Sequence, residues 1–272
     1  EISCSLVGSE MCIRDSSIFS DAEQKIAILS IILFSVSKYK YLHFLKNGNN
    51  FCCIFANRNL FEAKKQCHTF TLPNGLRIIH APNQSNVAYC GFAVDAGTRD
   101  ENEQEQGMAH FVEHLIFKGT QKRHAWHILN RMENVGGDLN AYTNKEETVI
   151  YSAFLVEHFS RAAELLADIV FHSTFPQHEI DKEVEVIIDE IQSYEDSPSE
   201  LIFDDFEELI FPNHPLGRNI LGKPDLLRSF KSEHALNFTS RFYKATNMIF
   251  FIQGNIDFKK VIRTIELSLI HI

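Results

Sequence analysis

Two pairs of short strand-like segments, each pair joined by a tight-turn sequence, constrain the fold of this chain most. Their bounds are residues 69–72 and 76–80 for the first pair, and 138–143 and 147–155 for the second. Pro73-Asn74-Gly75 separates the first pair, and Asn144-Lys145 separates the second. Strands joined by such short turns pair in antiparallel fashion. The sequence therefore predicts two β-hairpins.

Further segments indicate how the hairpins are covered. Residues 86–95 alternate in side-chain direction and carry few charges, which is typical of a buried strand, and residues 248–253 form another strand. Six segments have helical spacing or helix-ending signals: 108–117, 125–135, 157–171, 180–194, 198–210 and 233–243. Hairpins followed by clustered helices indicate the α+β class. We expect an antiparallel-rich mixed sheet with helices packed on one face.

The sequence predicts that the two ends of the chain differ in origin from its middle. Residues 11–16 and 267–272 can be back-translated into DNA strings that are reverse complements of each other, as the two ends of a sequencing library fragment are. We expect residues 1–16 and 267–272 to derive from adapter. Residues 17–67, basic and partly apolar, are interpreted as a leader or as read-through. Residues 68–266 form the interpretable domain.

The charge balance limits the class of partner. The chain has 26 Lys and Arg against 36 Asp and Glu, a net charge of −10. An acidic protein is a poor ligand for phosphate backbones, so we expect no nucleic-acid partner. The apolar run at residues 26–36 is too short to cross a bilayer, so we expect no stable membrane span.

The segment His110-Phe111-Val112-Glu113-His114 is the strongest chemical signal. On a helix, at about 100° per residue, His114 lies roughly 40° from His110 and Glu113 about 60° to the other side. Two imidazoles one turn apart can bind one Zn²⁺, with the carboxylate beside the metal. A solvated helix with incidental histidines is the alternative, but the apolar residues around the motif disfavour it. This order of residues is HxxEH, the inverse of HExxH.

At this point the sequence resembles the insulinase and mitochondrial-processing-peptidase family of zinc metallopeptidases. The matching segments, besides the motif, are Leu76-Arg77-Ile78-Ile79, Asp95-Ala96-Gly97-Thr98-Arg99, Phe117-Lys118-Gly119-Thr120, residues 136–143 and residues 214–222. The resemblance covers residues 68–266. It implies that this chain is the first of two similar halves, which together enclose a chamber.

The third zinc ligand follows only from the resemblance. Zinc in a peptidase needs a further protein ligand, with water in the fourth position. The residues alone leave four candidates open on the helix near residue 190: Glu183, Glu185, Asp189 and Glu190. The resemblance implies Glu190 as the ligand and Glu183 as a second carboxylate that tunes the site.

The resemblance also implies a reaction. His110, His114 and Glu190 would hold Zn²⁺, and Glu113 would act as general base in the hydrolysis of a peptide or unfolded polypeptide. Three residues, Phe111, Asn140 and Ala141, would contact substrate, the last two from a strand at an open sheet edge. The second half supplies an Arg and a Tyr in the family. We therefore expect this chain alone to be weakly active or inactive, and, as a bacterial-type member, to be cytoplasmic.

Two other classes of function remain open. The chain could be a non-catalytic partner subunit of a processing-peptidase-like assembly, although the intact motif disfavours this. It could also be a metalloenzyme of the S-ribosylhomocysteine lyase type, which uses a catalytic Cys and a Cys ligand. Neither Cys67 nor Cys90 has a suitable sequence setting.

Overall fold

A computed structural model describes residues 67–269 of the chain. The predictions for residues 1–16 and for residues 17–66 therefore lie outside the described residues, as do those for residues 270–272. Among the described helices, none is both long and apolar enough to span a bilayer.

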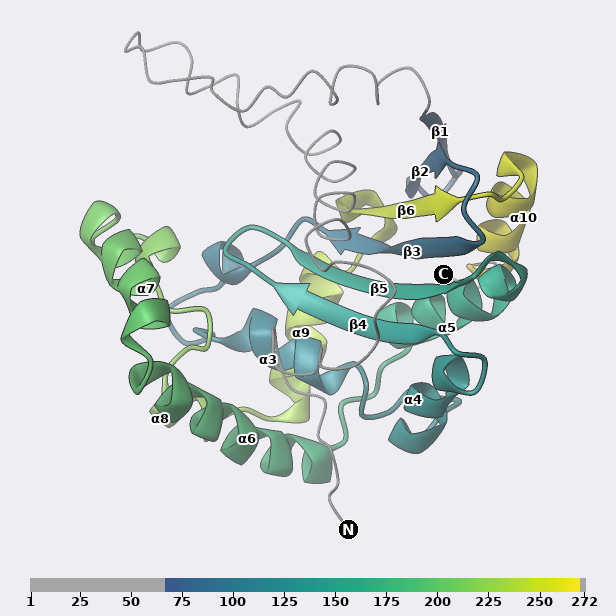
Figure 1. The fold of residues 1–272 in the computed structure, drawn as a ribbon. Helices are drawn as coiled ribbons and strands as arrows, with labels where there is room; N and C mark the ends of the chain where they lie inside the picture. The colour runs from purple at the N-terminus through teal and green to yellow at the C-terminus, as the bar shows by residue number, and fades with distance from the viewer. Residues whose placement is uncertain (1–66, 270–272) are drawn as a thin grey trace, which may run out of the picture.

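A six-stranded mixed sheet forms the centre of the fold (Figure 1). The strands are β1 (His68–Thr71), β2 (Arg77–Pro82), β3 (Val87–Val94), β4 (Asp138–Thr143), β5 (Thr148–Leu155) and β6 (Met248–Gly254). Their order is β1-β2-β6-β3-β5-β4, and only the β2–β6 pair is parallel. Both predicted hairpins are present, and the antiparallel-rich mixed sheet is confirmed.

The α-helices are α3 (Met108–Leu115), α4 (Ala125–Glu133), α5 (Phe159–Phe171), α6 (Gln177–Glu195), α7 (Pro198–Ile210), α8 (Pro224–Leu227), α9 (Ser232–Phe242) and α10 (Phe258–Ser268). The main hydrophobic core lies between the sheet and its helices, with Phe92 and Phe250 from the strands packed edge to face. A smaller cluster on the other sheet face centres on Val149 and Phe251. The predicted α+β class is confirmed.

The sequence pattern missed several short or terminal elements. They are the helices α8 and α10 and the 3₁₀ turns Thr98–Asp100, Pro215–Gly217 and Ala245–Asn247. A four-residue helix is too short to show periodicity. The helix α10 continues two residues past residue 266, and Leu269 behind it is buried.

Strand β4 and helix α3 define the place of the candidate site. The strand β4 is the last in the sheet, so one of its edges has no neighbouring strand within the described residues. The helix α3 packs against both β4 and α6. All eight residues of α3 are buried, including the three polar residues of the motif. The chain thus brings a buried polar helix face beside an open sheet edge.

Candidate metal centre

A buried carboxylate holds the start of α3. Glu101 accepts hydrogen bonds from the backbone N–H of Gly107 (2.9 Å) and of Ala109 (2.8 Å), which are otherwise unpaired at a helix N-terminus. Gly107 has φ +93°, and a Cβ there would lie 2.7 Å from the carbonyl of Leu221. Arg218 donates to the carbonyl of Glu101 (2.9 Å). The residue 214–222 segment therefore fixes the end of the helix that carries the motif.

Three potential metal ligands converge between α3 and α6. One ligand atom from each of His110, His114 and Glu190 lies within 4.8 Å of the others. Glu190 Oε2 lies 3.8 Å from His110 Nε2 and 3.7 Å from His114 Nε2. These distances are too long for hydrogen bonds. Two ligands of one tetrahedral zinc ion, each about 2.1 Å from it, stand roughly 3.4 Å apart.

Glu183 orients one of the two histidines. Its carboxylate lies 3.1 Å from His114 Nδ1 and 2.5 Å from the amine of Lys118. A proton on Nδ1, donated to the carboxylate, leaves Nε2 free to bind a metal. Burial opposes the negative charge of Glu183, but the hydrogen bonds from His114 and Lys118 outweigh burial and lower its pKa. Glu183 is therefore ionised.

Glu113 lies beside the donors and is held by the edge strand. It is 6% exposed, and the Thr143 side chain at the end of β4 lies close enough to affect its carboxylate. Burial raises the pKa of Glu113, while the Thr143 side chain and the proximity of His114 lower it in part. A carboxylate with a raised pKa beside a metal site is suited to accepting and returning a proton.

The donor set fits a divalent cation. His114 Nε2 and Glu190 Oε2 are buried and have no hydrogen-bond partner in the described part of the chain. Three carboxylates, from Glu113, Glu183 and Glu190, surround the two histidines, and a single amine, that of Lys118, pairs with Glu183. Burial raises the pKa of Glu190 and lowers that of His110 well below its usual range. Neutral imidazole is the form that binds metal. A bound Zn²⁺ would balance the charge.

The structure separates the four acidic candidates on α6. Glu183 is buried and Glu190 half-buried against α3, whereas Glu185 and Asp189 are exposed. Of the four, Glu183 and Glu190 are therefore the two that approach the histidines of α3, and their roles as tuning carboxylate and ligand stay a prediction.

The three residues expected to contact substrate lie in different settings. Asn140 is exposed on β4, and Ala141 is 8% exposed beside it. Phe111 is fully buried and packs against Phe230 with ring centroids 5.4 Å apart. Phe111 has no surface to offer a substrate in this structure, because it belongs to the core.

Sequence reasoning missed Lys118, Thr143 and Glu101. Lys118 and Thr143 stood in segments that matched the family, but no spacing rule connects either residue with its carboxylate partner. Glu101 lies in a polar, acidic loop where a buried carboxylate gives no separate signal. All three contacts join residues whose proximity depends on the tertiary fold.

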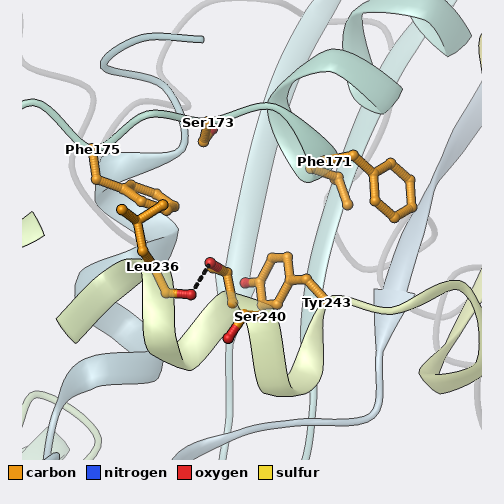
Figure 2. A pocket seen from close by; sticks show the side chains of 8 residues that line it. Phe171, Ser173, Phe175, Leu236, Ser240 and Tyr243 are labelled. Atoms are coloured by element: carbon orange, nitrogen blue, oxygen red, sulfur yellow. Dashed lines mark hydrogen bonds between the residues drawn. The ribbon is translucent and has the colours of Figure 1, made fainter. Parts of the chain in front are cut away.

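A cavity lies between the end of α5 and α9 (Figure 2). Its volume is about 230 Å³, and its walls come from the end of α5, the segment that follows it and α9, with Phe171, Phe175, Leu236 and Tyr243 among them. None of the predicted site residues lines it. The predicted metal ligands therefore lie in the α3–α6 cluster and not in the wall of this cavity.

Known proteins resemble this chain over the region that holds the cluster. The chain is 38% identical over 205 residues to an uncharacterized zinc protease of Rickettsia bellii, a match that covers 75% of this chain and 50% of that protein. It is 35% identical over 214 residues to a probable mitochondrial-processing peptidase subunit beta of Arabidopsis thaliana, covering 78% of this chain and 40% of that protein. The chain thus spans about half the length of these relatives.

The fold has matches among solved structures. A protease from Helicobacter pylori is similar with a TM-score of 0.73 and 23% identity, over 76% of this chain and 50% of that one. The profile of the insulinase family, peptidase family M16, matches residues 77–224, which include the motif, Glu183 and Glu190. The family predicted from the motifs is confirmed: the chain belongs to the insulinase family, peptidase family M16.

Proposed function

We propose that this chain is the zinc-binding domain of a metalloendopeptidase that hydrolyses extended or unfolded polypeptides. The observation that carries the proposal is the convergence of His110, His114 and Glu190 within 4.8 Å, next to the buried Glu113. The names of the relatives as zinc proteases support the choice of metal. His110, His114 and Glu190 are the proposed ligands.

Glu113 is the proposed general base. Zinc, when bound, supplies a Lewis acid and makes a water acidic enough to ionise near pH 7. Glu113 takes the proton of the attacking water and then returns it to the leaving amine. Thr143, whose side chain lies close to this carboxylate, would help to hold it while the proton moves. Glu183 and Lys118 keep the proton of His114 on Nδ1.

The free edge of β4 is the proposed binding site for the substrate backbone. Asn140 is exposed there, and its Oδ1 accepts a hydrogen bond from the N–H of Ala141 (2.8 Å). An extended peptide can add to such an edge by main-chain hydrogen bonds. A substrate strand would take over the bond that Asn140 now makes to Ala141. Main-chain binding of this kind favours extended substrates and is tolerant of their side chains.

A homologous second half, on the same polypeptide or on a partner subunit, completes the proposed enzyme. The chain covers 50% of the Rickettsia bellii relative and 50% of the Helicobacter pylori structure, so those proteins contain about as much chain again. We therefore expect the chain by itself to bind zinc but to hydrolyse peptides weakly or not at all. The cytoplasmic location expected of a bacterial-type member stays a prediction.

The test combines metal content with hydrolysis of a quenched fluorescent peptide by the complete gene product. Glu113→Gln should keep one zinc per chain and lose activity by on the order of a thousandfold or more, because the base is lost and the ligands are not. Glu133→Gln, an exposed change on α4, is the control. Hydrolysis at the wild-type rate by Glu113→Gln would reject the assignment of the base. A wild-type protein without zinc would reject the metal site.

A further inference from the structure

Helix α7 exposes a row of large apolar side chains. Ile202 is 60% exposed, Phe203 71%, Phe206 60%, Leu209 80% and Ile210 50%. At about 100° per residue these five side chains fall within roughly 120° of the helix circumference. They form one continuous face, which we call the α7 apolar face. A stripe of this width normally packs against a core.

The opposite side of α7 is polar and faces the body of the domain. Asp204 lies roughly 160° from Phe206 around the helix. Its carboxylate is 22% exposed, lies 3.4 Å from the amine of Lys145 and accepts a hydrogen bond from the Asn219 side chain (3.1 Å). Lys145 also lies 3.1 Å from Glu207. The helix is held by polar contacts to the β4–β5 turn and to the residue 214–222 segment.

The amphipathic order of α7 is therefore reversed relative to an ordinary surface helix. Ion pairs hold its inner side, and large hydrophobic residues point away from the domain. Figure 1 shows α7 standing at the outer margin of the fold, beyond the end of α6 and away from the sheet. Scattered exposed apolar residues are common in monomers, but a contiguous row of this size marks an interaction surface.

We propose that the α7 apolar face is the surface that binds the second homologous half. This inference rests on the two-half architecture in the proposed function. The relatives contain about as much chain again as the matched part, which supplies an occupant of domain size. An apolar face of this kind fits a permanent contact, since obligate interfaces resemble a domain core that has been divided.

A second copy of this chain is a poorer occupant on grounds of charge. Asp205 is exposed on α7, roughly 40° around the helix from Leu209 at the margin of the apolar face. In a two-fold dimer the same patch meets itself, so this carboxylate would be brought toward its own copy. The chain as a whole carries −10, which adds long-range repulsion. A different domain can place basic side chains there instead.

The position of the α7 apolar face connects the second half with the metal ligands. The helix α6 carries Glu190 and ends at Glu195, and α7 begins at Pro198. A domain seated on α7 therefore borders the helix that supplies the third ligand. The second half would be held next to the cluster by contacts that do not involve any ligand.

Site-specific photo-crosslinking tests the proposal. Phe206 is replaced by p-benzoylphenylalanine, which keeps an aromatic ring, in the complete gene product purified in its assembled form. Trp126, 66% exposed on α4, is replaced in the same way as the matched control. Crosslinked peptides are identified by mass spectrometry. We expect at least about tenfold more crosslink at position 206 than at 126, because an interface core excludes water.

The identity of the crosslinked peptide decides the outcome. Peptides from a second homologous domain, on the same chain or on a partner subunit, support the proposal. Peptides from residues 1–272, from the same chain or a second copy, would overturn it, as would an unrelated protein. A yield at position 206 no higher than at 126 would also overturn it. The readout needs neither zinc nor hydrolysis, so a failure of the proposed catalytic mechanism leaves it interpretable.

Discussion

Helices α6 and α7 follow one another with only two residues between them, yet they depart from ordinary helix design in opposite ways. The helix α6 turns carboxylates inward: Glu183 is 5% exposed, and Glu190 lies against the two histidines of α3. The helix α7 turns its apolar face outward, with Phe203 71% exposed. One helix buries charge and the other exposes hydrocarbon.

Each departure is unfavourable in the isolated chain and becomes favourable with a specific partner. A buried carboxylate costs free energy unless a cation or hydrogen bonds compensate it, and an exposed apolar row costs free energy unless another surface covers it. The inward carboxylates of α6 match a divalent ion. The outward face of α7 matches a protein domain. Two neighbouring elements thus indicate two partners of different chemistry.

Replacing the proposed ligand on α6, Glu190, should have the largest effect. Glu190→Gln should weaken zinc binding by on the order of a thousandfold, because an amide oxygen replaces a charged ligand. Competition with a chromophoric chelator measures the affinity. Glu185→Gln on the exposed side of the same helix should bind zinc as the wild type does. Equal weakening in both variants would mean that general charge, and not ligation, sets the affinity.

Glu101 is a buried carboxyl group outside the proposed metal site, and its titration should affect the free energy of unfolding. Burial raises the pKa of Glu101 to about 8, against the pull of the Ala109 and Gly107 N–H groups and Arg218. In the unfolded chain the pKa of Glu101 has its ordinary value of 4.5. Between pH 4.5 and about 8, Glu101 is therefore protonated in the folded chain and ionised in the unfolded chain. The free energy of unfolding should therefore fall as pH rises through this window, by a few kcal/mol as an order of magnitude (~1.4 kcal/mol per pKa unit).

Urea unfolding with a chelator present, at pH values from 5 to 8, measures this slope. Glu101→Gln should flatten it, because the titrating group is gone. Glu133→Gln, exposed on α4, should leave the slope unchanged. Parallel curves for the wild type and Glu101→Gln would show that another group causes the pH dependence.

Much of this molecule could be predicted from local sequence, and the reasons for the exceptions are physical. The hairpins around Gly75 and Asn144 depend on turn chemistry, and the predicted bounds of β4 and α7 agree with the structure. The HxxEH spacing places three groups on one helix face. The proposed ligand Glu190 lies 76 residues beyond His114, a distance that no helical periodicity spans. Its choice among four acidic residues required the family resemblance, and the contacts of Lys118 and Thr143 required the tertiary fold.

Replacing Lys118 should have a smaller effect on zinc affinity, because Lys118 acts through Glu183 on α6. Lys118→Met should weaken zinc binding by about 10–100-fold, because Glu183 would lose the cation that helps to orient it toward His114. Lys118→Arg should restore most of the affinity. Lys182→Met, exposed next to Glu183 on α6, is the matched control. If Lys118→Met binds zinc normally, then packing alone orients Glu183. A loss of thermal stability without zinc would indicate a merely structural role.

The smallest expected effect concerns α7 in the isolated chain. Phe206→Ala should change the free energy of unfolding by less than about 0.5 kcal/mol, because Phe206 is 60% exposed and packs little against its own domain. Phe238→Ala, from a fully buried residue on α9, should cost about 3–5 kcal/mol. Urea denaturation of the 272-residue chain compares the two. A loss above about 2 kcal/mol for Phe206→Ala would mean that this chain covers the α7 apolar face itself, because only buried apolar area contributes at that level. A near-zero change in the free energy of unfolding, together with strong crosslinking at position 206 in the assembled protein, would mean that the α7 apolar face binds a partner and does not stabilise its own domain.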